Sequence, residues 1–149
     1  MTRQEVEEML SKSKLLLRLA TVNREGDPEI QPVWYQYDKG RLYVMTGHDS
    51  RKVENIKHRS TVYFSVDTEI SPYKGIKGKA VATLLEDRKK AVAIAEEMGA
   101  RYLGSAHNPM AKRFTEQVSA GKDIVIEIVP KFFSVWNYEK AQPTRENSV

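Results

Sequence analysis

The stretch Leu42–Ile56, LYVMTGHDSRKVENI, holds the residues whose types and spacing point most directly to chemistry. An apolar segment ends at Thr46, a glycine-containing turn follows, and Ser50 stands where a helix N-cap is expected. The first turn of such a helix offers unpaired backbone N–H groups and the positive end of the helix dipole. Arg51 and Lys52 add two cationic side chains to that turn, beside the hydroxyl groups of Thr46 and Ser50. Together these groups predict a site that binds a phosphate.

The alternative for the same stretch is that Ser50 is an ordinary N-cap and that Arg51 and Lys52 are solvated. Cationic side chains in the first turn of a helix oppose its dipole unless an anion is present. This local conflict favours the phosphate site, because sequences break local rules mainly where function requires it.

Two further clusters have the residue types to line a flat aromatic ligand. The first is Pro32-Val33-Trp34-Tyr35, and the second is Pro72–Gly78, PYKGIKG. A slot lined by Trp, Met and Tyr side chains, with backbone amides at its polar edge, suits a planar cofactor. The alternatives are that Trp34 is a core aromatic and that the lysines of the second cluster lie on a solvated strand face. Gly75 and Gly78 lie within a predicted strand and indicate close approach of another backbone.

The composition limits the classes of function that remain. The chain has 149 residues, enough for one domain, of which 40% are hydrophobic and 30% charged, as is typical of globular proteins. It contains no cysteine, which excludes disulfides, thiolate nucleophiles and zinc–thiolate sites and agrees with a reducing cytoplasm. The three histidines show no metal-ligand spacing with carboxylates, so no metal site is expected.

Charge and the N-terminal residues narrow the expected partners. A net charge of +4 favours an anionic ligand, but no block of five consecutive basic residues suggests a nucleic-acid-binding arm. The first ten residues, MTRQEVEEML, lack the apolar region of a signal peptide, and no apolar run is long enough to span a membrane. We therefore expect a cytoplasmic protein that binds neither nucleic acid nor a membrane.

Hydrophobic periodicity and turn residues predict a mostly antiparallel β-barrel with helices at its ends, an α+β architecture. Strands are expected over residues 15–22, 29–37, 42–46, 61–66, 74–85, 124–129 and 132–136. Helices are expected over residues 3–13, 51–58, 87–101 and 108–120, the first with a capping box formed by Thr2 and Glu5. Residues 1–138 form the single predicted domain, and residues 139–149 form a polar tail.

The ordered set of these segments resembles a known family. Residues 21–67, from TVNREGDPEIQPVWYQY to STVYFSVD, look like the core of the pyridoxamine 5′-phosphate oxidase-like, FMN-binding split-barrel superfamily. SPYKGIKGKAVATLLED resembles the next strand of that family, and VPKFFSVWNYEK is similar to its final strand. The similarity covers roughly residues 10 to 138.

The resemblance implies a six-stranded Greek-key split barrel that forms a homodimer, with two cofactors in clefts between the subunits. It implies that the flavin phosphate is held by Thr46, Ser50, Arg51 and Lys52. It further implies that Pro32, Val33, Trp34, Tyr35 and Met45 lie along the flavin ring, that the partner subunit contributes Tyr73, Lys74 and Lys77, and that Trp136 lies near the cofactor.

One departure from the family limits the expected activity. Pyridoxamine-phosphate oxidases carry a C-terminal Arg-x-His element that grips the substrate phosphate, and here the region reads SVWNYEKAQPTRENSV without it. The expected function is therefore an FMN-dependent oxidoreductase of an unidentified small molecule, with no catalytic residue assigned. The alternatives are a reductase that uses the deazaflavin F420, whose branch the PVWY and PYKG stretches also resemble, a non-enzymatic flavin or haem carrier, and a small-barrel nucleic-acid binder. The Ser50-Arg51-Lys52 triplet favours FMN over F420.

Overall fold

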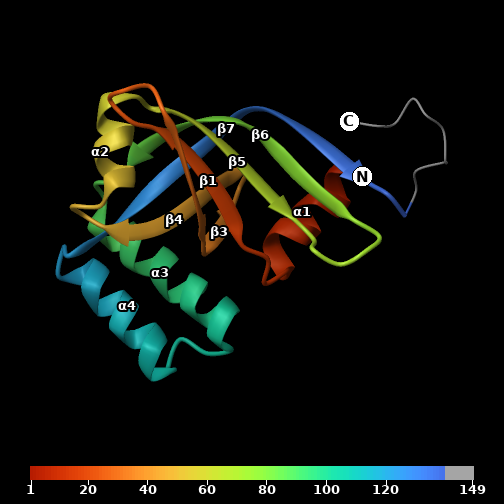
Figure 1. The fold of residues 1–149 in the computed structure, drawn as a ribbon. Helices are drawn as coiled ribbons and strands as arrows, with labels where there is room; N and C mark the ends of the chain where they lie inside the picture. Colours follow the sequence, from red (N-terminus) through yellow and green to blue (C-terminus); the bar gives the residue numbers. More distant parts are fainter. Residues whose placement is uncertain (140–149) are drawn as a thin grey trace.

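The computed structural model describes residues 1–139, which form four helices and seven strands (Figure 1). The helices are α1 (Arg3–Lys12), α2 (Arg51–His58), α3 (Arg88–Leu103) and α4 (Pro109–Ser119). The strands are β1 (Leu17–Val22), β2 (Pro28–Val33), β3 (Tyr35–Asp38), β4 (Arg41–Gly47), β5 (Thr61–Asp67), β6 (Lys74–Leu84) and β7 (Asp123–Asn137). The predicted polar tail lies outside the described residues except for Glu139.

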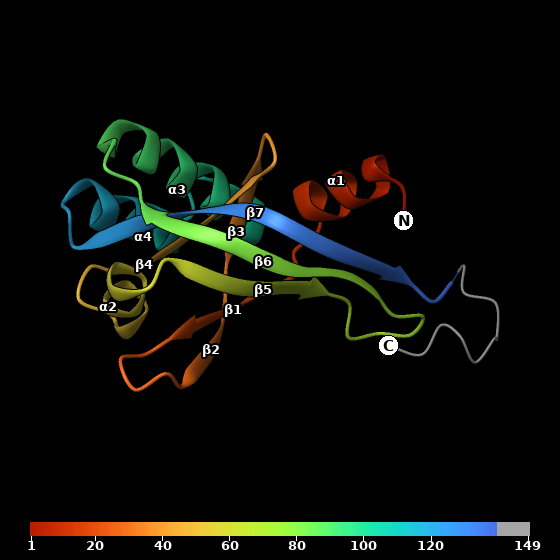
Figure 2. The same cartoon turned by 90° about the horizontal axis from the view of Figure 1, so that it is seen from above.

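All strand pairs are antiparallel, and the order in the sheet is β2-β1-β5-β6-β7-β4-β3. The two edge strands β2 and β3 are separated in the chain by Trp34 alone, so the sheet curls until its edges approach one another. Figure 2 shows α3 and α4 on one side of the long β6–β7 pair and the β1–β2 hairpin on the other. The expected antiparallel architecture with flanking helices is confirmed as a curled, half-barrel sheet with four helices.

The number of strands differs from the six that the family resemblance implies. The strand predicted over residues 29–37 is divided at Trp34, because β2 pairs with β1 and β3 turns away to pair with β4. The two strands predicted near the C-terminus are one strand, β7, with a bulge. There Lys79 pairs with Phe132 and Ala80 with Pro130, which leaves Lys131 as the extra residue.

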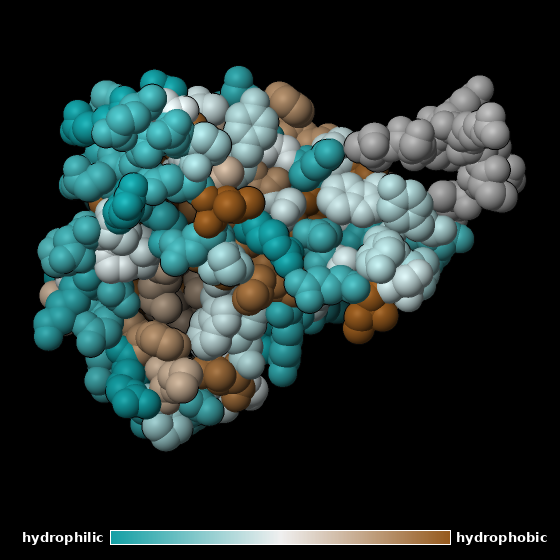
Figure 3. All heavy atoms as spheres, viewed as in Figure 1, coloured by the Kyte–Doolittle hydropathy of each residue, from teal (hydrophilic) through white to brown (hydrophobic). Residues whose placement is uncertain are grey.

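The predicted alternation along β6 is confirmed. Ile76, Ala80 and Ala82 are buried, and Lys77 points out from the opposite face. Apolar side chains of α1 close the interior of the curled sheet, whereas α3 packs on the outside of β4 and β7 and forms a second core cluster with them. On the face shown in Figure 3, apolar side chains form separate patches among hydrophilic ones.

Close packing explains the two glycines of β6. A Cβ atom on Gly78 would overlap the carbonyl oxygen of Phe132 and lie 2.9 Å from Cα of Phe133. A Cβ atom on Gly75 would lie 2.5 Å from Cβ of Asp67 and 2.6 Å from the ring of Trp136. The predicted close approach is therefore confirmed, and the approaching groups belong to neighbouring strands of the same chain.

Arg101, near the end of α3, ties three parts of the fold together. Its guanidinium donates to the carbonyl oxygen of Leu10 at 2.8 Å, to that of Tyr35, and to the hydroxyl group of Tyr102 at 3.0 Å. The same group stacks on the rings of Tyr35 and Tyr102, at 4.4 and 4.7 Å from their centroids. These contacts of Arg101, called the Arg101 clamp below, hold α1 and the start of β3 against α3. Within residues 1–139, no helix combines the length and apolar character needed to span a membrane.

Candidate functional site

The N-terminus of α2 is built as expected from local sequence. Ser50 is the N-cap, and its side chain accepts from the backbone N–H of Val53 at 3.5 Å. The turn before the helix closes through a hydrogen bond from the N–H of Ser50 to the carbonyl oxygen of Gly47, at 3.1 Å. The hydroxyl group of Thr46 donates to that of Ser50 at 3.1 Å, so the two predicted hydroxyl groups do lie together.

Lys52 is the cation of this turn that lacks an acidic partner. Its ammonium donates to the side-chain oxygen of Gln31 on β2, and within residues 1–139 it forms no ion pair. The side chain is partly buried, and this burial lowers the pKa of Lys52. A partly desolvated ammonium that faces only a neutral amide is an unfavourable arrangement, and an anion beside it would relieve the penalty.

Arg51 differs from Lys52 because it already has a partner. Its guanidinium forms an ion pair with Glu29 of β2 at 2.5 Å, although 78% of its side chain is exposed. The other carboxylate oxygen of Glu29 accepts from the buried amide of Asn55 at 2.7 Å, and the same amide donates to the hydroxyl group of Thr21 at 3.0 Å. Glu29 is therefore held in place and neutralises Arg51.

Glu29 and Asn55 are the residues of this region that sequence reasoning missed. Asn55 lies four residues after Arg51, on the side of α2 that faces the sheet, which is an unusual place for an amide. A buried amide needs a hydrogen-bond partner, so an Asn on the side of the helix that faces the sheet points to a polar group on a strand. Nothing in the sequence identifies Glu29 as that partner.

The aromatic cluster after β2 is divided between two environments. The ring of Trp34 stacks on Tyr102 with centroids 4.7 Å apart, and the ring of Phe114 meets it edge-on at 5.4 Å. Tyr35 is fully buried, and its hydroxyl group donates to the carbonyl oxygen of Leu10 at 2.9 Å. Burial raises the pKa of Tyr35. The side chain of Tyr35 thus lies in the core, and its backbone N–H and carbonyl groups are already bonded to the side chains of Tyr102 and Arg101.

The remaining predicted ring-binding residues lie at different depths. Pro32 is exposed on β2, and Val33 packs against the inner core. Met45 packs against the second core cluster, beneath α3. Trp136 pairs with Gly75 across the β6–β7 ladder, and its ring covers that glycine.

Lys77 lies on the outer face of the sheet, in a hollow of about 400 Å³. Exposed apolar side chains share this face, among them Ile30, Tyr63 and Phe132. Arg18 also lines the hollow but is paired with Asp67 and Glu69. Lys74 is the first residue of β6, and the exposed Tyr73 precedes it.

The strand register separates the two predicted halves of the site. Thr46 pairs with Ile124 near the start of β7, whereas Lys77 lies beside Ser134 ten residues further along. Measured along β7, these positions are about 30 Å apart at the usual rise per residue. On the β2 side of the sheet the two regions approach more closely, because Gln31, which accepts from the ammonium of Lys52, follows Ile30, which lines the same hollow as Lys77.

Among residues 1–139, no three His, Asp or Glu side chains lie close enough together to hold a metal ion. The groups that the structure does bring together are the hydroxyl pair and the helix N-terminus, and Lys52 extends from the same turn to Gln31. These groups suit an oxyanion such as a phosphate.

A family model described as pyridoxamine 5′-phosphate oxidase matches residues 2–136. Among solved structures, the chain resembles a conserved hypothetical protein from Mycobacterium tuberculosis with a TM-score of 0.82 and 22% sequence identity, over 94% of this chain and 87% of that one. It resembles an F420 reductase with a TM-score of 0.67 and 25% identity, over 85% of this chain and 94% of that one. It also resembles the haem storage protein HutZ from Vibrio cholerae, with a TM-score of 0.71 and 18% identity over 91% and 93% of the two chains. No curated protein sequence matches.

Proposed function

Because the chain belongs to the pyridoxamine 5′-phosphate oxidase family, we propose that it binds flavin mononucleotide and acts as an oxidoreductase on a small molecule. A bound flavin supplies hydride or single-electron transfer through its ring, and the protein supplies binding and orientation. The missing Arg-x-His element argues against pyridoxamine phosphate as the substrate.

The observation that carries the proposal is that Lys52, in the first turn of α2 after the Ser50 cap, contacts a neutral amide and no acidic group among residues 1–139. The lowered pKa of Lys52 reflects a burial penalty that a phosphate would remove, and the hydroxyl groups of Thr46 and Ser50 add hydrogen-bonding capacity on the same turn. Arg51 fits less well, because it must leave or share Glu29 before it can contact a phosphate. The donor set around Lys52 therefore suits the phosphate end of a flavin, with Arg51 in an auxiliary role.

We further propose that the complete cofactor site forms between two copies of the chain. Thr46 and Lys77 are ten residues apart in register along β7. The outer face around Lys77 exposes large apolar side chains, with 71% of Ile30, 51% of Tyr63 and 60% of Phe132 accessible. Such a face is typical of a protein–protein contact. A second copy packed there would supply the cations that the α2 end lacks.

Binding experiments on α2 test the phosphate assignment. Lys52→Met keeps the length of the side chain and removes its charge, and Lys57→Met is the matched control on the exposed side of the same helix. Loss of one charge-assisted hydrogen bond to phosphate costs about 1.5–3 kcal/mol, so the Kd for FMN should rise by about 10- to 100-fold in Lys52→Met alone. Equal affinities of the two variants would contradict the assignment.

Subunit mixing tests the shared site. Lys52→Met and Lys77→Met should each bind FMN weakly as homodimers. Refolding an equal mixture should restore about one intact site in four, because half of the dimers are mixed and each mixed dimer holds one unaltered site. If the mixture binds no more FMN than the separate variants, the two residues do not come from different subunits of one site. Either both lie in the site of a single chain, or neither of them binds FMN.

A reductase that uses F420 is the second candidate, because the relative named F420 reductase is 25% identical over most of both chains. Titrating the cofactor-free protein with FMN and with F420 under the same conditions distinguishes the two, and tighter binding of F420 would overturn the choice of FMN. A Soret band without flavin absorbance in the purified protein would favour haem storage instead, which is the function given in the name of the Vibrio cholerae relative.

A further inference from the structure

Glu29 of β2 places a carboxylate beside the phosphate site proposed at α2, and both of its oxygens are occupied. One pairs with the guanidinium of Arg51 at 2.5 Å, and the other accepts from the amide of Asn55 at 2.7 Å. We propose that Glu29 makes the site selective for a phosphate group with one negative charge, as in a phosphodiester, over a group with two, as in a phosphomonoester. The inference rests on the proposed binding of a flavin phosphate at the N-terminus of α2.

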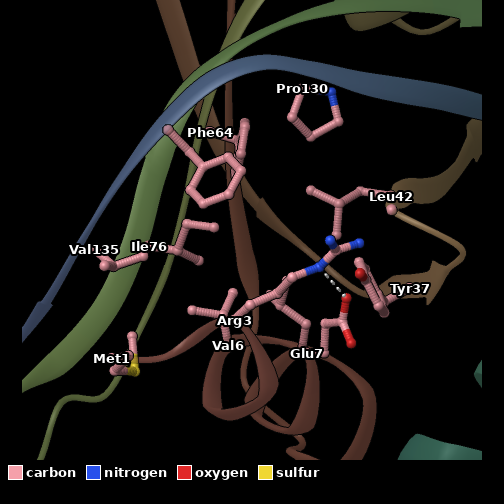
Figure 4. Close-up of a pocket in the computed structure, with 13 residues that line it drawn as sticks. Met1, Arg3, Val6, Glu7, Tyr37, Leu42, Phe64, Ile76, Pro130 and Val135 are labelled. Carbon is pink, nitrogen blue, oxygen red and sulfur yellow. Dashed lines mark hydrogen bonds and ion pairs between the residues drawn. The ribbon is translucent and has the colours of Figure 1, made fainter.

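Glu29 is held more firmly than a typical surface carboxylate. The Arg3–Glu7 pair of α1, at the groove shown in Figure 4, is an ordinary surface pair, because its side chains are 92% and 45% exposed. The side chain of Glu29 is 30% exposed, and its partner Asn55 is buried and also donates to the buried hydroxyl group of Thr21. Moving Glu29 away would leave this buried amide short of an acceptor, which costs free energy. The carboxylate therefore stays in place when a ligand arrives.

The two cations of the first turn exceed this fixed carboxylate by one charge. Arg51 and Lys52 supply two positive charges, and Glu29 compensates that of Arg51. A phosphate group with one negative charge would match the charge that remains. A second negative charge would find no further cation in the turn and would add to the repulsion from Glu29. It would also lose more hydration on binding, because charge that leaves water without a partner is penalised.

Other charged groups at the turn act mainly in the same sense. The carboxylates of Asp49 and Asp123 lie beside Gly47, where a Cβ atom would be 3.5 and 3.9 Å from their oxygens. Neither aspartate forms an ion pair within residues 1–139. Glu54, in the first turn of α2, adds an exposed carboxylate, and the exposed Lys122 next to Asp123 offsets part of this negative charge. The surroundings therefore disfavour a second negative charge on the ligand.

Flavins can carry either kind of phosphate group. FMN is a monoester, and since the second pKa of such a phosphate is about 6, the group carries close to two negative charges at neutral pH and above. A flavin with a phosphodiester carries one charge at that group. The selectivity of Glu29 thus favours a flavin diester, or FMN that has taken up a proton, over fully ionised FMN. The proposed oxidoreductase chemistry is the same for each, because it takes place at the ring.

Three flavins with the same ring and different charge test the proposal at about pH 8, where the monoester is fully ionised. Riboflavin has no phosphate, riboflavin cyclic phosphate carries one negative charge, and FMN carries two. The Kd of each is measured by flavin fluorescence for wild type, Glu29→Gln and Glu25→Gln. Glutamine removes the charge of Glu29 and keeps the oxygen that accepts from Asn55. Glu25→Gln is the matched control, because Glu25 lies exposed in the turn between β1 and β2 and the change in net charge is the same.

The expected changes in affinity scale with the charge of the ligand. Glu29→Gln should leave the Kd of riboflavin unchanged and strengthen binding of the cyclic phosphate about threefold, as expected for one nearby unit charge in a hydrated setting. The gain for FMN should be about the square of that factor, or roughly tenfold, because its phosphate carries twice the charge. Glu25→Gln should change each Kd by less than about twofold, since solvent and salt screen its charge. Wild type should bind the cyclic phosphate at least as tightly as FMN, and this comparison decides if Glu29→Gln does not fold.

Several results would overturn the selectivity. Equal gains for FMN and the cyclic phosphate in Glu29→Gln are one, and equal effects of Glu29→Gln and Glu25→Gln are another. If Glu29→Gln does not fold, tighter binding of FMN than of the cyclic phosphate by wild type has the same meaning. Failure of the phosphate site itself is recognised separately, because wild type would then bind riboflavin as tightly as both phosphates and Lys52→Met would change nothing. If FMN binding depends on Lys52 but not on Glu29, the phosphate site stands and only the role of Glu29 is wrong.

Discussion

Replacing Arg101 with methionine tests whether the clamp at the end of α3 holds the N-terminal helix in place. Methionine keeps much of the apolar length of the side chain but removes every hydrogen bond that the guanidinium donates. The carbonyl oxygen of Tyr35 loses this partner, and that of Leu10 keeps only the hydroxyl group of Tyr35. Stacking of the guanidinium between the rings of Tyr35 and Tyr102 is lost as well.

The size of the effect follows from these contacts. Hydrogen bonds from a charged group contribute about 1.5–3 kcal/mol each, and two of them reach backbone carbonyl oxygens here. Part of this gain is offset, because the partly buried guanidinium is desolvated and its Nε finds no acceptor. We therefore expect Arg101→Met to lower the free energy of unfolding by about 2–4 kcal/mol. For a chain of this size that corresponds to a fall in Tm of roughly 6–12 °C.

Urea denaturation and hydrogen exchange together provide the assay. Lys89→Met, an exposed substitution on the same helix, is the control and should change stability by less than about 0.5 kcal/mol. Arg101→Lys should recover only part of the loss, because an ammonium cannot bridge several acceptors in the fixed plane of a guanidinium. Relative to wild type, Arg101→Met should accelerate hydrogen exchange of the α1 amides more than that of the β5 amides. A loss below about 1 kcal/mol, or unchanged exchange in α1, would refute the role given to the clamp.

Three other predictions concern Lys52, the glycines Gly78 and Gly47, and Asn55. In the folded state the pKa of Lys52 lies below its ordinary value of 10.5, so just below pH 10.5 the unfolded chain binds more protons than the folded one. The stability of wild type relative to Lys52→Met should therefore increase as the pH rises through this window. Urea titrations at neutral and alkaline pH measure the difference. Gly78→Ala should cost about 2–4 kcal/mol in the same assay because its new methyl group meets backbone atoms of β7, whereas Gly47→Ala, whose Cβ meets nothing closer than 3.5 Å, should be tolerated. Asn55→Ala should cost about 1–3 kcal/mol, since a buried hydroxyl group and a carboxylate both lose a donor, and circular dichroism should show that α2 remains folded.

Local signals were sufficient for elements whose ends are set by nearby residues. Helix α2 runs from Arg51 to His58 as predicted, because its N-cap interaction reaches only three residues along the chain. The capping box of Thr2 and Glu5 at α1 was predictable for the same reason. The alternating faces of β6 were equally accessible, because a strand places successive side chains on opposite sides.

Elements that depend on distant contacts were not predictable in the same way. The break at Trp34 follows from a stack on Tyr102 and from the burial of Tyr35 beneath α1, and neither partner is near in sequence. Pro130 and Lys131 suggest the end of a strand, yet β7 continues because β6 pairs with it on both sides of the bulge. Chain-wide pairing overrides local preference in both cases.

The candidate site shows the same division at the level of single side chains. The sequence places Arg51 and Lys52 in one helical turn and gives no reason to prefer either as a phosphate ligand. The β1–β2 hairpin then brings Glu29 to one of them and only a neutral amide to the other. Glu29 is fixed by the buried amide of Asn55, so its charge cannot swing away without cost. An arriving phosphate would thus be repelled by Glu29 near Arg51 and attracted by an uncompensated ammonium at Lys52. It follows that the anion affinity of α2 depends chiefly on Lys52.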